Sequence, residues 1–345
     1  TWDEALVTAV SWMKPLRDTA PERLAFFTGR DQSQSFTGWW AQMFGTPNYA
    51  AHGGFCSVNM AAAGIYTLGG AFWEFGSPDW ERTRLLVLFG VAEDHDSNPI
   101  KIGLGRLKAR GVRVIGVNPI RTGYNAIADD WLGITPGTDG LLILGLIHCL
   151  LQAGRIDTEY LARWTNAPFL VNETDGPENG LILKNAESQP FVIDRRTGQP
   201  APWDGRGVEP DLGATWQGHR TVFQHLAERY LSPAHAPEAV ADRCGIPAPR
   251  IRALAAEIAA AAFDVPCVIE APWTDFRGDA HPRMVGRPVS FHAMRGISAH
   301  SNGFQTARAL HLLQILLGSV ETPGGWRMKP PYPKPVEAHP TPHFT

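Results

Sequence analysis

The chain has 345 residues, of which 44% are hydrophobic and 19% are charged, and its formal net charge is −3. This composition excludes a disordered chain, and the length is enough for about two folded domains. The small net charge gives no electrostatic reason to expect nucleic-acid binding, and no apolar run approaches the 18 residues of a membrane-spanning helix.

The first predicted elements are a helix, a strand and a second helix. Residues 1–4 form a capping-box pattern, and apolar residues then recur at helical spacing. The short apolar run at 23–27 predicts a buried strand, and 34–44 predicts a helix. Residues 45–54 contain proline, asparagine and a glycine pair, so we expect a loop there.

A β-α-β pattern follows from residue 85. Strands are predicted at 85–89, 112–117 and 131–134, with helices at 99–110 and 139–151 between and after them. Strands that alternate with helices predict an α/β fold with parallel strands. In such folds, ligands bind at the carboxyl ends of the strands.

The second half of the chain begins with a change of character. Residues 166–216 are rich in Gly, Pro, Asn and Asp, so we expect an irregular or hairpin-rich excursion. Further on, the pattern predicts one buried strand, at 266–270. Helices are predicted at 222–231, 237–243, 249–262 and 301–319.

Several loops lie where a phosphate-bearing ligand would bind. They hold Gly29 and Arg30, the segment 90–98, the segment 118–122 and the segment 136–139. Glycine allows close backbone approach, arginine can pair with phosphate, and the Asp139 carboxylate can accept hydrogen bonds from a guanine base. Glycine-rich loops of this kind are also common at the ends of strands and the starts of helices in proteins that bind no ligand there. The GxGxxG fingerprint is missing after residue 89, which argues against a nicotinamide dehydrogenase.

Cys56 is the residue with the most distinctive setting. It follows a glycine pair and precedes a predicted helix, and a helix N-terminus stabilises a thiolate that can act as a nucleophile or soft-metal ligand. The alternative is a small buried hydrophobic residue. We adopt that interpretation for Cys149, Cys244 and Cys267, since no CxxC pair indicates a zinc site or a disulfide framework.

Five motifs in order resemble a known family. They are Thr1–Leu6, Gly45–Asn48 followed by Cys56, Gly90–Pro99, the run from Asn118 to Asp139, and the run from Ser301 to Gly325. Together they are similar to the large catalytic subunit of molybdenum or tungsten bis-pterin guanine dinucleotide oxidoreductases, the dimethyl-sulfoxide reductase family.

The resemblance implies an α/β fold with two doubly wound, mostly parallel-sheet domains, one inserted into the other. The first would comprise 1–82 plus 263–325, and the inserted one 83–262. Residues 326–345 would be an extended connector to a region outside the sequence, because the chain reads as the middle of a longer protein. Each domain would bind one guanine dinucleotide arm.

The resemblance also implies a set of site residues. Cys56 would be the metal ligand and catalytic residue, with His52, Arg295 and His300 as further catalytic candidates that orient an anionic substrate. Arg277 is another anion-orienting candidate. Asn118 stands where the family has Asp, and the usual Arg is displaced to Arg121. The cofactor-binding residues would be Gly29, Arg30, Gly90, Glu93, His95, Asn118, Thr122, Pro136, Gly137, Asp139 and Asn302.

The implied cofactor is a molybdenum bis(molybdopterin guanine dinucleotide), with tungsten as an alternative metal. The implied reaction is a two-electron oxo or sulfur transfer on sulfite, thiosulfate or polysulfide. Ser57 replaces the His that formate dehydrogenases carry after the ligand. Formate dehydrogenase, nitrate reductase and a cofactor-free structural relative remain alternatives.

The expected partners are all concerned with electron transfer. The resemblance implies an iron–sulfur cluster in a part of the protein outside these residues. It also implies an iron–sulfur electron-transfer subunit, with a membrane quinone subunit beyond it. It favours a cytoplasmic, membrane-associated complex over a periplasmic one.

Overall fold

The structure is a computed structural model that describes most of the chain. The described residues are 1–29, 34–52, 58–70, 75–91, 100–121, 123–293 and 295–328, without the side chains of 34, 35 and 295. They form an α/β fold with parallel strands, as the sequence predicts. None of the described helices is long and apolar enough to cross a membrane.

Helix α1 (Trp2–Thr19) begins where the capping-box pattern predicts. The Thr1 side-chain oxygen accepts a hydrogen bond from the backbone N–H of Glu4 at 3.3 Å, and the Glu4 side chain reaches back to the cap residue. No residue of α1 is buried. The helix therefore owes its form to local capping and propensity more than to described packing partners.

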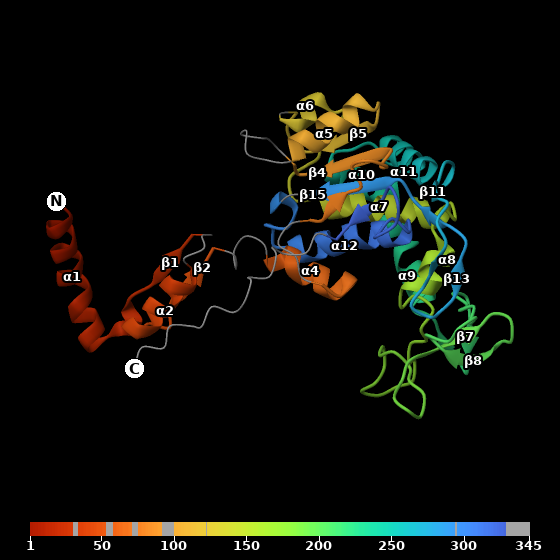
Figure 1. Ribbon diagram of the computed structural model, residues 1–345, viewed down its shortest axis with the longest axis horizontal. Coiled ribbons are helices and arrows are strands. Elements are labelled where there is room, and N and C mark those ends of the chain that lie inside the picture. The colour runs from red at the N-terminus through yellow and green to blue at the C-terminus, as the bar shows by residue number, and fades with distance from the viewer. Residues whose placement is uncertain are drawn as a thin grey trace.

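A small parallel pair of strands follows α1. β1 (Phe26–Thr28) pairs with β2 (Tyr49–Ala51), and α2 (Gln34–Phe44) connects them. In Figure 1 these elements lie apart from the rest of the molecule. The predicted loop at 45–54 is wrong in part because β2 lies within it. Its pairing partner is more than 20 residues away, so local composition does not reveal the strand.

The central sheet has four parallel strands. Their order is β15 (Val289–Ala293), β4 (Leu85–Phe89), β5 (Arg113–Val117) and β6 (Asp130–Leu132). All five residues of β4 and of β15 are buried, which explains why β4 is a continuous apolar run. Because the strands are parallel, all four carboxyl ends meet at one edge.

Helices cover both faces of this sheet (Figure 1). Leu86 and Leu88 of β4 pack on one side, against α5 (Ile100–Ala109) and α6 (Tyr124–Ile127). The alternate β4 residues belong to the larger core on the other side. That core is closed by α4 (Val58–Leu68), α7 (Asp139–Gln152), α11 (Ala248–Phe263) and α12 (Gly303–Leu316).

The excursion at 166–216 contains the hairpin of β7 (Phe191–Asp194) and β8 (Gln199–Pro202), which confirms its predicted character. The other elements are short. They are η1 (Pro21–Arg23), β3 (Ser77–Pro78), α8 (Thr158–Trp164), β9 (Thr215–Trp216), β10 (His219–Arg220), α9 (Val222–Tyr230), η2 (Pro233–His235), α10 (Pro237–Cys244), β12 (Trp273–Thr274), β13 (Ala280–His281), η3 (Arg295–Ile297) and β16 (Trp326–Arg327).

The prediction of a strand at 266–270 is confirmed, but the prediction that it is buried is wrong. β11 (Cys267–Ile269) exists, but it pairs antiparallel with β14 (Met284–Gly286) and Val268 is 41% exposed. The strand that enters the parallel sheet from this part of the chain is β15, which the sequence pattern does not predict. A short apolar run does not reveal which partner it will pair with.

The two-domain division remains a prediction, and two findings bear on its boundaries. β15 comes from the segment assigned to the first domain, yet it pairs with β4 of the segment assigned to the inserted one. Trp326 is fully buried and forms β16 with β3, so the predicted connector at 326–345 does not begin at 326.

Candidate functional site

The carboxyl edge of the four-stranded sheet gathers several predicted residues. Gly90 follows β4, Asn118 follows β5, and the turn 136–139 comes after β6. The segment that follows β15 carries His300 and Asn302 to the same turn. Successive loops therefore converge at one edge of the sheet, as parallel strands require.

Gly90 lets the chain turn sharply at the end of β4. Its φ is +63°, and its N–H donates to Val117 O at 3.0 Å. A Cβ at this position would lie 3.1 Å from the Ile297 side chain. Glycine thus allows the turn after β4 to lie directly against the segment after β15.

Asn118 is buried at the end of β5. Its backbone N–H donates to Leu132 O at 3.2 Å, and its carbonyl accepts from the Trp131 indole at 3.0 Å. The side-chain Nδ2 is also buried, and it has no hydrogen-bond partner among the described residues. A buried amide donor without a partner is costly, so an acceptor on a bound ligand would stabilise this side chain.

Specific hydrogen bonds fix the conformation of the turn before α7. Gly137 has a φ of +79°, and its carbonyl accepts from Asn302 Nδ2 at 3.0 Å. Thr138 donates its hydroxyl to Thr135 O at 2.6 Å, so that hydroxyl does not cap the helix. The backbone N–H groups of Leu141 and Leu142 donate to Thr138 O, and the Asp139 carboxylate lies at this helix end, where the helix dipole favours a negative charge.

Asp139 is the first residue of α7 and is only 7% exposed. Burial raises the pKa of its carboxyl group, while its own backbone N–H and the nearby His300 act in the opposite direction. His300 lies close to the turn, because a Cβ at Gly137 would be 3.7 Å from its Nδ1. A carboxylate in this setting can accept paired N–H donors from a base such as guanine.

Helix α4 begins at this same edge. Asn59, in its first turn, donates from Nδ2 to Ser298 O at 2.8 Å, which ties α4 to the segment after β15. Cys56 precedes Asn59 by three residues and lies outside the described residues.

Gly29 and His52 occupy the corresponding edge of the β1–β2 pair. Gly29 follows β1, and His52 follows β2 and donates its backbone N–H to Thr28 O at 3.1 Å. Both residues are exposed. The predicted site residues therefore divide between the carboxyl edges of two parallel sheets, the β1–β2 pair and the four-stranded sheet.

Arg277 lies elsewhere. It is buried in the turn between β12 and β13, and its Nη2 donates to Arg163 O at 3.2 Å. This turn is not at the carboxyl edge, so the structure does not place Arg277 with the other candidates. Arg30, Cys56, Glu93, His95, Thr122 and the side chain of Arg295 lie outside the described residues.

Sequence reasoning missed Asn125. It projects from α6 and donates from Nδ2 to Val91 O at 3.1 Å. Its side chain also fills the space above Gly116 of β5, where an added Cβ would lie 2.1 Å from Asn125 Oδ1. A glycine inside a buried strand was the available signal that another group approaches closely.

The remaining cysteines fit the structural interpretation. Burial raises the pKa of the Cys149, Cys244 and Cys267 thiols, which keeps them protonated at neutral pH. Within the described ranges, no group of three or more His, Cys, Asp or Glu residues is placed to hold a metal ion.

Comparison with known proteins identifies the family. The family model described as molybdopterin oxidoreductase matches residues 1–330. A sulfite dehydrogenase subunit from Allochromatium vinosum is 45% identical over 99% of this chain and 37% of its own length. The thiosulfate reductase molybdopterin-containing subunit from Salmonella typhimurium is 25% identical over 48% of this chain and 22% of its own length.

A solved structure supports the fold. Acetylene hydratase from Pelobacter acetylenicus superposes with a TM-score of 0.56 at 19% identity, covering 93% of this chain and 33% of that one. The matched part of these larger proteins is between 22% and 37% of their length. Because the family model matches nearly every residue, the chain belongs to the molybdopterin oxidoreductase family.

Proposed function

We propose that the chain is part of the catalytic subunit of a molybdenum oxidoreductase that acts on a small sulfur oxyanion, with sulfite as the favoured substrate. The observation that carries this proposal is the 45% identity to a sulfite dehydrogenase subunit over 99% of the chain. The similarity to a thiosulfate reductase subunit supports the same substrate class. Formate dehydrogenase and nitrate reductase remain as alternatives for the test to separate.

The carboxyl edge of the sheet fits one dinucleotide arm of the proposed bis(molybdopterin guanine dinucleotide) cofactor. The buried Nδ2 of Asn118 offers a donor that lacks a partner among the described residues. Asp139, at the start of α7, suits the guanine base. When bound, this cofactor supplies a metal centre that takes up two electrons at a time.

Cys56 is the proposed protein ligand to the metal. It precedes Asn59 by three positions in the sequence. Asn59 contacts Ser298 at the carboxyl edge. In the sequence, Cys56 comes two residues before the first residue of α4, and a helix N-terminus stabilises a thiolate.

Sulfite oxidation to sulfate takes one oxygen atom from water and releases two protons and two electrons. We assign His52 and Arg295 to orienting the sulfite anion, since an oxyanion needs fixed N–H donors. His300 lies beside Asp139, where we place the guanine base, so it is not assigned to the substrate. In this proposal the two electrons leave through an iron–sulfur relay, and a quinone bound by a membrane subunit is the final acceptor.

A cysteine substitution in the full-length subunit tests this assignment. Cys56→Ser is expected to lower sulfite-dependent reduction of an artificial acceptor about 100-fold, because a hard serine oxygen would replace the soft thiolate and even outer-shell changes cost 10- to 100-fold. The melting temperature should remain unchanged. Cys267→Ser, at a half-buried thiol away from the edge, is the matched control and should keep full activity.

Two outcomes would contradict the proposal at different points. Full activity in Cys56→Ser removes the metal-ligand assignment. Wild-type enzyme that oxidises formate or reduces nitrate, and does not turn over sulfite, thiosulfate or polysulfide, removes the substrate class and leaves the family intact.

A further inference from the structure

A groove of about 1500 Å³ lies beside the helices that cover the larger core. Outward faces of α7 and α12 line it, and residues of α8 and α9 line its far part. α7 and α12 pack closely because Gly140 faces Thr306, whose hydroxyl would lie 3.0 Å from a Cβ at Gly140. One end of the groove, at Gly137 and Asn302, borders the candidate site.

The groove is apolar along its helices. Leu141 and Leu144 of α7, Leu226 of α9, and Leu312 and Ile315 of α12 line it, and each is only partly buried against the core. On α7 and on α12 these residues are three apart, so each pair lies on one face of its helix. An apolar face of this extent marks an interaction surface.

Three arginines around the groove carry positive charge that no described carboxylate neutralises. Arg229, Arg243 and Arg308 line the groove and are exposed. None of them forms an ion pair with another residue in the described part of the chain. Glu321 is one of two carboxylates in the lining.

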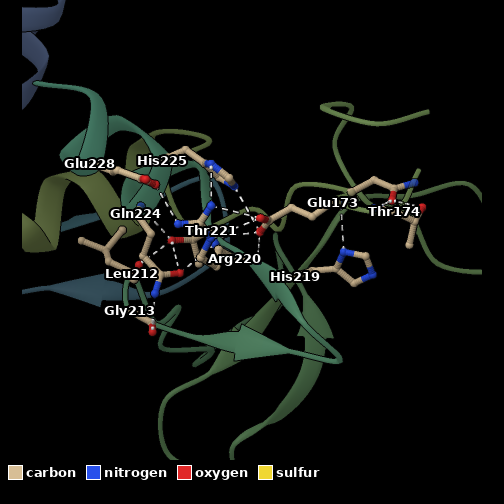
Figure 2. Close-up of polar contacts among 11 residues, drawn as sticks. Glu173, Thr174, Leu212, Gly213, His219, Arg220, Thr221, Gln224, His225 and Glu228 are labelled. Carbon is tan, nitrogen blue, oxygen red and sulfur yellow. Dashed lines mark hydrogen bonds and ion pairs between the residues drawn. The ribbon is translucent and has the colours of Figure 1, made fainter. Parts of the chain in front are cut away.

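The other lining carboxylate, Glu228, already has an arginine partner. Its Oε2 lies 2.8 Å from Arg220 Nη1, and Arg220 also holds Glu173 at 3.0 Å. Figure 2 shows Arg220 between these two carboxylates, with His225 beside them. The Arg220 guanidinium lowers the pKa of Glu173 to about 2. This network fixes α9 to the excursion and leaves Glu228 unavailable to Arg229.

A fourth lining arginine is neutralised from the opposite side. Arg163 Nη1 lies 2.5 Å from Asp275 and 2.9 Å from Asp279. Counting every arginine and carboxylate of the lining, four arginines stand against two glutamates, so the described lining of the groove is net positive. A complementary occupant needs apolar side chains on one face and acidic side chains along its edges.

The size of the groove matches a helical segment. A helix about 10 Å across that rises 1.5 Å per residue fills roughly 120 Å³ per residue, so this groove holds about a dozen residues. The chain spans 37% of the length of its sulfite dehydrogenase relative, so a protein of that size has further polypeptide to cover this face. Residues 329–345 are proline-rich with a single acidic residue, Glu337, and do not have this pattern.

From the apolar floor, the unpaired arginines and the size, we infer that the groove between α7, α9 and α12 binds an acidic amphipathic helix. We assign this helix to another part of the same catalytic subunit, outside the 345 residues. This mode of recognition places apolar side chains at i, i+3, i+4 and i+7 in the groove. The inference is independent of the substrate proposed above.

Photocrosslinking in the purified full-length subunit tests the occupant. A photoreactive residue at position 312 is expected to form an adduct with an acidic amphipathic segment of the same polypeptide, outside these 345 residues. The same residue at position 102, 65% exposed on α5 across the sheet, is the matched control and should not give this adduct. Mixing isotope-labelled and unlabelled subunits distinguishes adducts within one polypeptide from those between two copies.

An adduct with a second copy, with a different subunit, or with no segment at all would overturn the inference. A charge reversal gives an independent readout. Arg308→Glu should lower the melting midpoint of the full-length subunit by a few degrees, and reversing an acidic residue in the crosslinked segment should restore it. Arg106→Glu, at an exposed position on α5, should leave the midpoint unchanged.

The rescue decides this second experiment, because Arg308 also lies over the Phe304 ring at 5.5 Å and bonds Gln305. A loss that no reversal in the crosslinked segment restores would assign the effect to these local contacts and refute the docked helix.

Discussion

Asp139 illustrates how a single residue can be adapted to a ligand at the expense of the ligand-free protein. Its carboxyl group is buried, and no described side chain donates a hydrogen bond to it. Burial raises its pKa in the folded state above the ordinary value in the unfolded chain. Between these two pKa values the folded state binds more protons, so the contribution of Asp139 to stability falls as pH rises.

At neutral pH we therefore expect Asp139→Asn to stabilise the cofactor-free full-length subunit, with the gain fading as pH falls from the raised pKa of Asp139 toward the ordinary Asp value. The same change should weaken guanine-nucleotide retention about 10- to 100-fold, since hydrogen bonds to a charged group contribute about 1.5–3 kcal/mol. Melting curves across pH and nucleotide released on denaturation measure the two effects. Asp175→Asn, at an exposed position, is the control.

Wild-type nucleotide content in purified Asp139→Asn enzyme would show that the carboxylate does not hold the base. A melting difference that does not vary with pH would show that the raised pKa of Asp139 is not the source of the stability change.

At the scale of elements, the long amphipathic helices and the fully apolar strand β4 are predictable from local pattern. The pattern predicts α7 at 139–151, and the helix lies at Asp139–Gln152. β15 escapes prediction because Ser290 and His292 interrupt its apolar residues, although both are buried in the sheet. Its partner β4 lies about 200 residues earlier. Only long-range pairing distinguishes it from β11, which forms a half-exposed hairpin instead.

The candidate site shows the same limit. Asn118 and Asp139 are predictable because strand ends and helix starts can be located from sequence. Asn125 and Asn59 are not predictable, because each donates a hydrogen bond to a backbone carbonyl that is distant in the sequence. The separation is 34 residues for Asn125 and 239 residues for Asn59. Side-chain bonds to distant backbone leave no local pattern.

Asp157 connects α8 to Arg287, which lies between β14 and β15, and gives a prediction at this scale. Its Oδ1 accepts from Tyr160 N at 2.9 Å and caps α8, while Oδ2 accepts from Arg287 Nε at 2.7 Å. Asp157→Ala removes a cap that contributes about 1 kcal/mol and leaves a mostly buried arginine unpaired, so we expect a total loss of about 2–3 kcal/mol. Thermal unfolding of the full-length subunit measures it.

Asp157→Asn separates the two contributions, because it keeps the capping oxygen and removes the charge. It should lose less than Asp157→Ala. Asp242→Ala, at an exposed position on α10, should be near neutral. Equal losses for Asn and Ala at position 157 would show that the cap contributes nothing.

At the scale of the whole molecule, the described chain has two parallel sheets, and each carries predicted cofactor-binding residues at its carboxyl edge. The β1–β2 pair ends at Gly29 and His52, and the four-stranded sheet ends at Gly90, Asn118 and the turn before α7. Parallel strands place ligand-binding loops at their carboxyl ends. A cofactor with two dinucleotide arms would use both edges, while a ligand with one arm would use one.

Hydrogen–deuterium exchange of the cofactor-loaded and cofactor-free full-length protein distinguishes these cases. We expect loading to slow exchange in the peptides that follow β1 and β2, and also in those that cover 118–123 and 136–141. Helix α5, which covers one face of the sheet, should exchange equally in both states and serves as the internal control. Protection confined to the four-stranded sheet would mean that this chain holds a single arm, and that the β1–β2 edge has another role.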